Sequence, residues 1–223
     1  FYEKRYAGTG FLYHARIVTQ MLEGIKFRDG RYSDKVLDVG CGIGFVSQLY
    51  PNFDIIGIDI SDEMLRRNVY TRRKASAESI PFGDNSFDFV ICRSLLHHLE
   101  DPRKGLAEMV RVLKPGGHWV CWEPNLSIFN DWIRRLSKLT RRFSHWHKSF
   151  SPKELVEMIE QSGLKITSVK YHGHLAYPLM GFPDILNCHI PLSLGRFLMD
   201  VDETLSRTFL APTGWAVMIK ATR

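Results

Sequence analysis

The stretch KVLDVGCGIG, residues 35–44, places three glycines within five positions directly after an apolar run. The run, residues 35–39, predicts a buried strand of a parallel sheet, because short β-branched segments bounded by glycine are typical of such strands. Glycine is needed where the backbone adopts a positive φ, or where a ligand approaches closer than a Cβ allows. Gly40, Gly42 and Gly44 therefore predict a tight turn wrapped against a small molecule.

The composition favours a single domain, residues 1–223, because 223 residues with 44% apolar content can bury a full core. The sequence has no run of 18 uncharged apolar residues, which excludes a transmembrane helix, and no charged-then-apolar signal segment opens the chain. The four cysteines form no CxxC pair, and no histidine stands at ligand spacing from them. We therefore expect neither a disulfide framework nor a metal site, and a cytoplasmic location.

Strand and helix patterns alternate along the chain, which predicts right-handed crossovers and an open parallel sheet covered on both faces. The capping box at residues 151–154 marks the start of a helix that ends at Gly163. Further helices are expected at 11–25, 45–50, from Ser61 onward, at 103–113 and near 194–209. Further strands are expected at 54–59, 74–78, 87–92, 118–122, 166–171 and 216–221.

Asp59 ends the second predicted strand, 15 residues beyond Gly44. An acid at this place can accept both ribose hydroxyls of an adenosine lying across the strand ends, where open α/β sheets bind ligands. The alternative is a solvated carboxylate at a strand end. The dinucleotide fingerprint would require its third glycine where Phe45 stands, which disfavours a nicotinamide-linked oxidoreductase.

Five stretches, in order, resemble the class I S-adenosylmethionine-dependent methyltransferases of the small-molecule group, with a methyltransferase type 11 domain. They are VLDVGCGIGFVS, IIGIDISDEML, SAESIPFGDNSFDFVICRSLLHHLEDP, LAEMVRVLKPGGHWV and GWAVMIKATR. The resemblance implies a Rossmann-like, doubly wound, seven-stranded and mostly parallel sheet with helices on both faces. From the pattern along the chain we further expect an N-terminal helical lid (1–30), a cofactor-binding core (31–123) and helical substrate-covering insertions (124–150 and 174–212).

The resemblance implies S-adenosylmethionine as cofactor, S-adenosylhomocysteine as product, and no metal. The glycine-rich turn would pack against the methionine part, whose amino group Asp38 would orient, and Asp59 would hold the ribose. Residues after the fourth predicted strand would close over the sulfonium. Where the family usually has Asp at the adenine, this chain has Ser76. The implied cofactor-binding residues are Asp38, Gly40, Cys41, Gly42, Gly44, Asp59, Ile60, Met64, Ser76, Ala77, Glu78, Cys92, Arg93 and Ser94.

His97 and His98 follow the fourth predicted strand by a few residues. Methyl transfer requires alignment of the acceptor, exclusion of water and, where the acceptor loses a proton, a base. A histidine that titrates near neutral pH suits that task. We favour His98 as the base and expect the His97 side chain to point elsewhere, and a packing or capping role is the alternative for both.

A basic segment lies between residues 131 and 148, where six basic residues stand against one acid. A solvated helix face is one interpretation, and a surface for an anionic membrane or an anionic acceptor is another. Nucleic acid is disfavoured, because Cys92-Arg93-Ser94-Leu95 stands where base-modifying methyltransferases carry an Asn/Asp-Pro-Pro-aromatic stretch. The basic residues are Arg134, Arg135, Lys138, Arg141, Arg142 and Lys148.

The sequence therefore predicts methyl transfer from S-adenosylmethionine to a small-molecule or lipid-like acceptor. One alternative is a catalytically idle S-adenosylmethionine-binding regulatory or scaffold protein, because no residue is uniquely catalytic. An RNA methyltransferase and an NAD-dependent oxidoreductase fit the residues less well.

Overall fold

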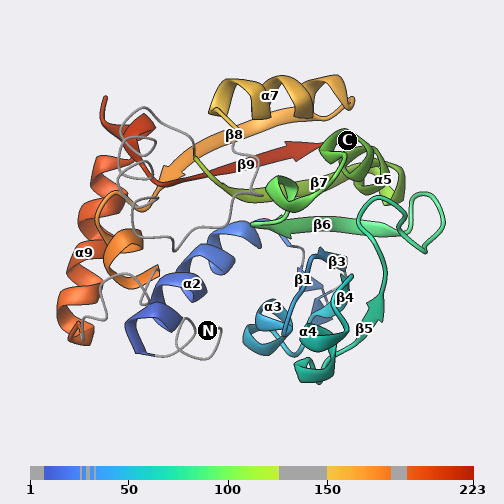
Figure 1. Cartoon of the computed structure of the whole chain (residues 1–223), viewed down its shortest axis with the longest axis horizontal. Coiled ribbons are helices and arrows are strands. Elements are labelled where there is room, and N and C mark those ends of the chain that lie inside the picture. The colour runs from blue at the N-terminus through green and yellow to red at the C-terminus, as the bar shows by residue number, and fades with distance from the viewer. Residues whose placement is uncertain (1–7, 26, 29–30, 33, 126–149, 182–189) are drawn as a thin grey trace.

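A seven-stranded sheet, in the order β5-β4-β3-β6-β7-β9-β8, forms the centre of the computed structural model (Figure 1). The structure describes residues 8–25, 27–28, 31–32, 34–125, 150–181 and 190–223. The strands β5, β4, β3, β6 and β7 pair in parallel, and β9 pairs antiparallel with both β7 and β8. The strands are β3 (Lys35–Val39), β4 (Asp54–Asp59), β5 (Arg72–Lys74), β6 (Phe87–Arg93), β7 (Leu113–Pro124), β8 (Lys165–His172) and β9 (Ala216–Thr222).

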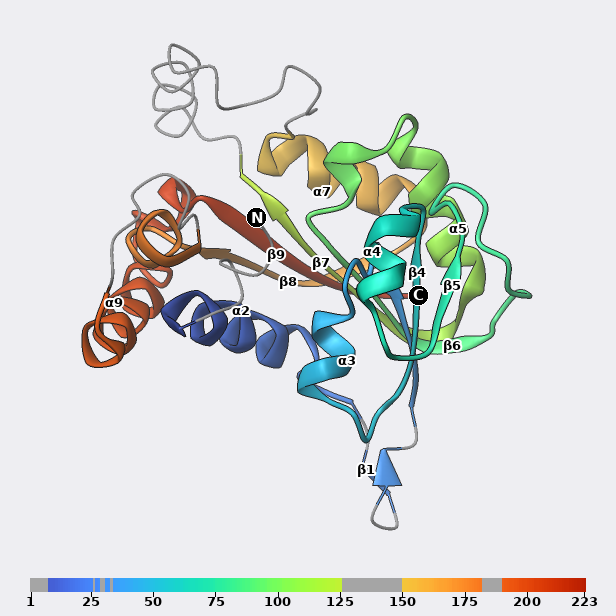
Figure 2. The same cartoon turned by 60° about the horizontal axis from the view of Figure 1, so that its bottom comes forward.

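Helices cover both faces of this sheet, so that two apolar layers form its core (Figure 2). α5 (Pro102–Val112) and α7 (Pro152–Gln161) cover one face, and α2 (Gly8–Met21) and α3 (Phe45–Leu49) cover the other. The doubly wound fold and the mostly parallel sheet predicted from the sequence are confirmed. The remaining helices are α4 (Asp62–Arg67), α9 (Leu192–Leu205), the 3₁₀-helices η1 (Leu96–His98) and η3 (Ala211–Thr213), and the π-helix η2 (Tyr177–Gly181).

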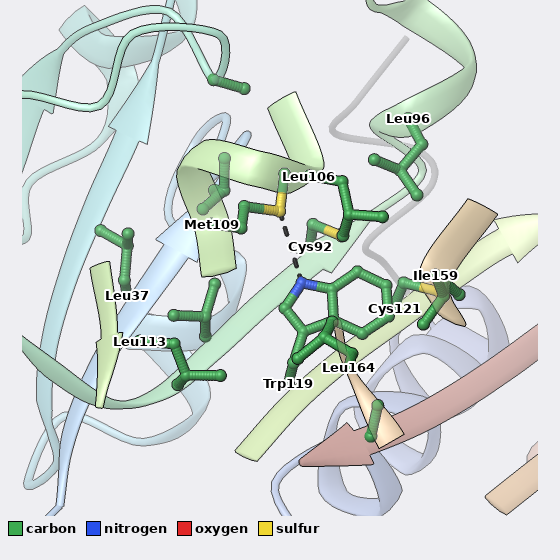
Figure 3. Close-up of a cluster of buried hydrophobic side chains, with 14 of the residues drawn as sticks. Leu37, Cys92, Leu96, Leu106, Met109, Leu113, Trp119, Cys121, Ile159 and Leu164 are labelled. Carbon is green, nitrogen blue, oxygen red and sulfur yellow. Dashed lines mark hydrogen bonds between the residues drawn. The ribbon is translucent and has the colours of Figure 1, made fainter. Parts of the chain in front are cut away.

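The α5 face of the sheet is packed around Trp119 of β7, which is fully buried (Figure 3). Its indole Nε1 donates a hydrogen bond to Met109 Sδ of α5 (3.5 Å), so this buried polar group has a partner. The thiols of Cys92 and Cys121 belong to the same apolar cluster. Burial raises the pKa of both thiols well above the usual value, which suits a packing role.

α2 lies between the sheet and α9 (Figure 1). Two side-chain contacts join the helices: Arg16 pairs with Asp200 (2.8 Å), and Gln20 Nε2 donates to Glu203 Oε2 (3.3 Å). The helix begins at Gly8 and ends at Met21, a few residues earlier than the predicted 11–25. None of the helices in the described ranges is both long and apolar enough to cross a membrane.

Local sequence signals place the ends of several elements to within one residue, including those of β3, β4 and α5. The capping box at Ser151 and Glu154 is present, and Ser61 Oγ accepts the hydrogen bond from Met64 N at the start of α4. Two strands differ from the prediction. β7 runs from Leu113 to Pro124, through the Pro-Gly-Gly stretch, instead of beginning at residue 118. The third strand spans Arg72–Lys74, whereas residues 76 and 79 form only an isolated bridge, so the prediction of 74–78 is wrong. The pairing of Gly57 with Arg72 sets that register, and no local pattern encodes it.

One element was not predicted, and one predicted feature is not described by the structure. β1 (Phe27–Arg28) and β2 (Arg31–Tyr32) form a short antiparallel pair that the sequence analysis missed. The basic segment, and with it most of the predicted insertion 124–150, lies outside the described residues. The described part of the insertion 174–212 contains η2, α9 and η3.

Candidate cofactor and acceptor site

The glycine-rich turn after β3 adopts the backbone predicted for it. Gly40, Gly42 and Gly44 have φ values of 75°, 53° and 81°, which disfavour any side chain. The N–H groups of Gly40 and Cys41 both donate to the Ile58 carbonyl (2.8 and 3.0 Å), which fixes the turn to the neighbouring strand β4. Among the described residues, no heavy atom lies within 4 Å of the position that a Gly42 Cβ would take. The turn therefore presents its backbone to open space at Gly42.

Asp59, at the end of β4, connects this turn to the next helix. Its Oδ2 accepts a hydrogen bond from Gly42 N (2.8 Å), and its Oδ1 accepts one from Ser61 N (2.8 Å). A carboxylate oxygen offers two lone-pair sites, so each oxygen keeps capacity for a further donor. Asp59 is thus oriented at the strand end with acceptor capacity left for two hydroxyls.

Asn68 also holds the turn, and sequence reasoning missed it. Its side chain is 1% exposed, and its Nδ2 donates to the Gly42 carbonyl (3.4 Å) and to Cys41 Sγ (3.6 Å). A Cβ on Gly44 would lie 2.4 Å from Asn68 Oδ1, so the third glycine is required by this contact. An Asn just beyond a short helix carries no recognisable motif, because its partners precede it by more than 20 residues.

Asp38 of β3 is 2% exposed, and no hydrogen bond to its carboxylate is found within the described ranges. The pKa of this carboxyl is raised to about 7 in all: burial is the main cause, the charge of Arg93 opposes it, and the charge of Asp59 adds to it. A desolvated carboxylate is stabilised when a cation binds beside it. The structure therefore supplies a buried acid suited to a cationic amino group.

The residues expected at the adenine lie along β4, α4 and the turn after β5. Ile60 is an apolar side chain left 68% exposed next to Asp59, and Met64 in α4 is partly exposed. Ser76 Oγ accepts a hydrogen bond from Glu78 N (3.1 Å). Glu78 Oε1 accepts one from Asp101 N (3.1 Å), and Ala77 is buried in the core. Ile60 is therefore an exposed apolar side chain on which a planar ring could pack.

The three residues at the end of β6 play different parts. The Cys92 thiol packs in the core, so this residue can contribute to the site only through its backbone. Ser94 has a φ of 51°, and its N–H donates to the Trp122 carbonyl (2.7 Å). Arg93 points to the α2 side, where Nη1 donates to His14 Nδ1 (3.3 Å) and the guanidinium carbon lies 5.3 Å from the centre of the Phe45 ring.

Aromatic side chains gather around Arg93 between α2 and the sheet. The His14 ring lies 6.4 Å from the rings of Phe45, Trp122 and Tyr177, and Trp122 lies 5.3 Å from Tyr177 in an edge-to-face arrangement. Trp122 is 1% exposed, and its indole Nε1 has no hydrogen-bond partner among the residues that the structure describes. This aromatic cluster stands beside the carboxyl ends of β6 and β7, and the Trp122 N–H is a buried donor within it.

His97 and His98 lie in η1, directly after β6. His97 is buried, and its Nδ1 lies 2.7 Å from Oε2 of Glu123, which is fully buried. His98 is exposed, and the two imidazole rings are in contact, with centroids 4.0 Å apart and planes tilted by 39°. The expectation that His97 points away from His98 is therefore wrong. Sequence reasoning also missed Glu123, which stands 26 residues from His97.

The geometry fits the cofactor that the resemblance implies. The open backbone at Gly42, the buried acid Asp38 and the oriented carboxylate of Asp59 all lie at the carboxyl ends of β3 and β4. Such a set matches a ligand with an amino group at one end and a ribose at the other. Within the described ranges, no group of His, Cys, Asp and Glu could hold a metal ion.

Comparison with known proteins gives consistent findings. Residues 37–121 match the family model of a methyltransferase domain. The chain is 30% identical over 193 residues to the demethylmenaquinone methyltransferase of Symbiobacterium thermophilum, with 79% of this chain and 70% of that one covered. It is 29% identical over 153 residues to an uncharacterized methyltransferase, YcgJ, of Bacillus subtilis, covering 59% of this chain and 60% of that one. The match thus spans less than two thirds of the Bacillus protein.

A similar fold occurs in a solved structure from Thermotoga maritima, described as an S-adenosylmethionine-dependent methyltransferase and possible histamine N-methyltransferase. The TM-score is 0.66, with 99% of this chain and 93% of that one covered. At 20% identity this likeness concerns the fold alone.

Replacing Asp59 tests the ribose assignment. We expect Asp59→Ala to weaken S-adenosylhomocysteine binding by about 1.5–3 kcal/mol, because the ribose hydroxyls lose a charged acceptor and Gly42 loses its hydrogen bond. Calorimetry measures the affinity. Asp62→Ala is the matched control: this carboxylate lies three residues further on, at the start of α4, is 61% exposed and pairs with Lys74. An affinity within about twofold of wild type for Asp59→Ala would refute the assignment.

The raised pKa of Asp38 predicts a pH dependence of the same binding step. A cationic amino group binds the ionised carboxyl, so with a pKa of about 7 the affinity should rise between pH 5.5 and 7.0, by at most roughly 15-fold if only the ionised form binds. The folding stability of the free protein depends on pH in the opposite direction. The folded pKa lies above the unfolded one, so this group's contribution to stability is full below pH 4 or so and is lost as the pH rises through about 7.

Calorimetric titrations with S-adenosylhomocysteine across that range check this expectation. Asp38→Asn is the matched variant, because it keeps the shape and removes the ionisation. It should bind weakly with little pH dependence. A wild-type affinity that stays constant from pH 5.5 to 7.0 would show that Asp38 does not bind the amino group.

Proposed function

The chain belongs to the S-adenosylmethionine-dependent methyltransferases, and from this premise we propose that it transfers a methyl group to a small, ring-bearing acceptor of lipid-like character. Family membership implies the cofactor and a small-molecule acceptor in general terms. What we propose beyond this is the chemical class of the acceptor. The observation that carries it is the buried aromatic cluster beside the carboxyl ends of β6 and β7.

The cofactor side of the proposal rests on three features. The backbone at Gly42 borders open space, Asp38 is a buried acid that a cation would stabilise, and Asp59 keeps acceptor capacity at the strand end. The methionine part of S-adenosylmethionine would lie against the glycine turn, and the adenine against Ile60. When bound, this cofactor supplies an electrophilic methyl group on a positively charged sulfur.

The acceptor side rests on the chemistry of the aromatic cluster. Aromatic side chains favour stacking and edge contacts with a planar ring, and the Trp122 N–H can donate to one oxygen of the ring. Arg93 would favour an acceptor oxygen that carries negative charge as it reacts. The demethylmenaquinone methyltransferase among the relatives is named for a ring-bearing acceptor. This name supports the class and fixes no individual substrate.

One imidazole of η1 supplies the base that such an acceptor needs. A hydroxyl acceptor loses its proton as the methyl group is transferred, and a positioned imidazole accelerates that step by about 10²–10⁴-fold. His97 and His98 both lie just after the carboxyl end of β6, among the residues expected to close over the sulfonium. The proton would pass from the imidazole to solvent after the transfer.

Transfer of a labelled methyl group tests the proposal. We expect S-adenosylmethionine to methylate at least one member of a panel of short-chain prenylated catechols and naphthoquinols, with S-adenosylhomocysteine formed in equal amount. Transfer RNA and NAD serve as comparison ligands in the same experiment. Tight S-adenosylhomocysteine binding without transfer to any acceptor would indicate a catalytically idle binding protein instead. Transfer to RNA alone would favour the nucleic-acid alternative.

A lipid-like acceptor gives the basic segment a role that can be measured. The net charge of residues 131–148 is +5, with tryptophan and phenylalanine between the basic residues. We expect the protein to cosediment with anionic vesicles more than with neutral ones, and the difference to fall as salt rises. Replacing Arg134, Arg135 and Arg141 with Gln should abolish it, whereas Lys153→Gln with Lys165→Gln should not. Equal sedimentation with both vesicles would refute this role.

A further inference from the structure

Glu123 is the most completely buried carboxylate at the carboxyl edge of the sheet, and neither the cofactor side nor the aromatic cluster uses it. It is 0% exposed near the end of β7. Its Oε1 accepts hydrogen bonds from the N–H groups of Leu95 (2.8 Å) and Leu96 (2.9 Å), and its Oε2 lies 2.7 Å from His97 Nδ1. Burying a carboxylate is costly unless donors surround it, and three donors from one turn do so here.

These contacts determine which nitrogen of His97 carries the proton. An ionised carboxylate only accepts hydrogen bonds, so Nδ1 must donate to Glu123 Oε2. In the neutral imidazole the other nitrogen, Nε2, then holds the lone pair. Nε2 lies on the ring edge opposite the buried carboxylate, and the His97 side chain is 11% exposed. The pair thus holds a basic nitrogen in one tautomer and one orientation.

The pair also lies next to the cofactor turn. The pairing of β6 with β7 ends at Arg93 and Trp122, so Glu123 is the first β7 residue beyond its pairing with β6. The side chain of Leu95, whose N–H Glu123 binds, would come within 2.9 Å of a Cβ on Gly40. The turn that carries His97 is therefore packed directly on the glycine turn expected to hold the methionine part.

We propose that Glu123 is a positioning residue, which holds His97 in the Nδ1–H tautomer so that His97 Nε2 is the general base of methyl transfer. This inference rests on the proposed function. In the step, Nε2 takes the proton of the acceptor hydroxyl. The oxygen lone pair forms the new O–C bond, and the electron pair of the S–C bond remains on sulfur. His97 thereby replaces His98, favoured from the sequence, as the base, and the His98 ring contacts the ring of His97.

The matched variant is Glu123→Gln. Its amide can keep the hydrogen bonds from the backbone, but it reverses the direction of the hydrogen bond with the His97 ring. The amide oxygen would accept from the N–H groups of Leu95 and Leu96, and the amide NH₂ would then face His97 Nδ1. Since an NH₂ group donates, Nδ1 must become the acceptor and the proton must move to Nε2. A carboxylate-to-amide change of this kind preserves shape and imposes the wrong tautomer.

Two-bond ¹H–¹⁵N correlation of ¹⁵N-histidine-labelled protein reads the tautomer without any acceptor. His97→Asn identifies the His97 signals among the nine histidines. At a pH where the ring is neutral, we expect Nδ1–H in wild type and in His98→Asn, and Nε2–H in Glu123→Gln. An Nε2–H tautomer in wild type would overturn the proposal whether or not the variant folds. So would a His97 ring that stays doubly protonated from pH 6 to 9.

Single-turnover methyl transfer to a reactive member of the catechol panel tests the base itself. We expect Glu123→Gln and His97→Asn to slow transfer on the order of 10²-fold, with S-adenosylhomocysteine affinity within about twofold of wild type. His98→Asn should remain near the wild-type rate. A larger loss for His98→Asn than for His97→Asn would overturn the assignment. If the expected tautomers occur and no acceptor is methylated, the proposed function fails and the positioning of His97 by Glu123 stands.

Discussion

The hydrogen bond from Gly42 N to Asp59 Oδ2 is the contact on which the arrangement of the cofactor side depends. It joins the turn after β3 to the end of β4, and the second oxygen of the same carboxylate binds Ser61 N at the start of α4. One side chain thereby holds a strand end, a helix start and a turn whose three glycines all have positive φ values. A turn of this kind is strained for any residue with a Cβ, and an oriented acceptor offsets part of its ordering cost.

The sequence predicted this half of the site because its determinants are local. The apolar run before the glycines, the acid at the end of the next strand and the cap at Ser61 are patterns of a few residues, and the structure has them in those places. The third strand was misplaced because its register comes from pairing with β4. A one-residue slip in register changes which side chains face the core, so such errors come from contacts that no local pattern contains.

The other half of the site depends on contacts between distant segments, and sequence reasoning could not resolve it. His97 and His98 are neighbours of one type, and nothing in the stretch SLLHHLEDP indicates which is buried. The buried Glu123 determines this, and it comes from the next strand of the sheet. Cys92 is the converse case. Its place in the motif predicted a cofactor-binding residue, but its side chain packs in the core beside Trp119.

Charge burial explains why the two halves meet at one edge. On the α2 side, Asp38 and Arg93 carry opposite charges at the ends of adjacent strands, and Arg93 is further held by His14. On the α5 side, the Glu123 carboxylate is satisfied by the turn that follows β6. The carboxyl groups of Asp38 and Glu123 are both withdrawn from water at the carboxyl edge, where a parallel sheet gathers the ends of its strands. A reaction between a positively charged sulfur and an oxygen that loses a proton needs fixed charges of this kind, oriented before the reactants arrive. The sheet topology provides the edge, and the long-range pairs determine what chemistry the edge supports.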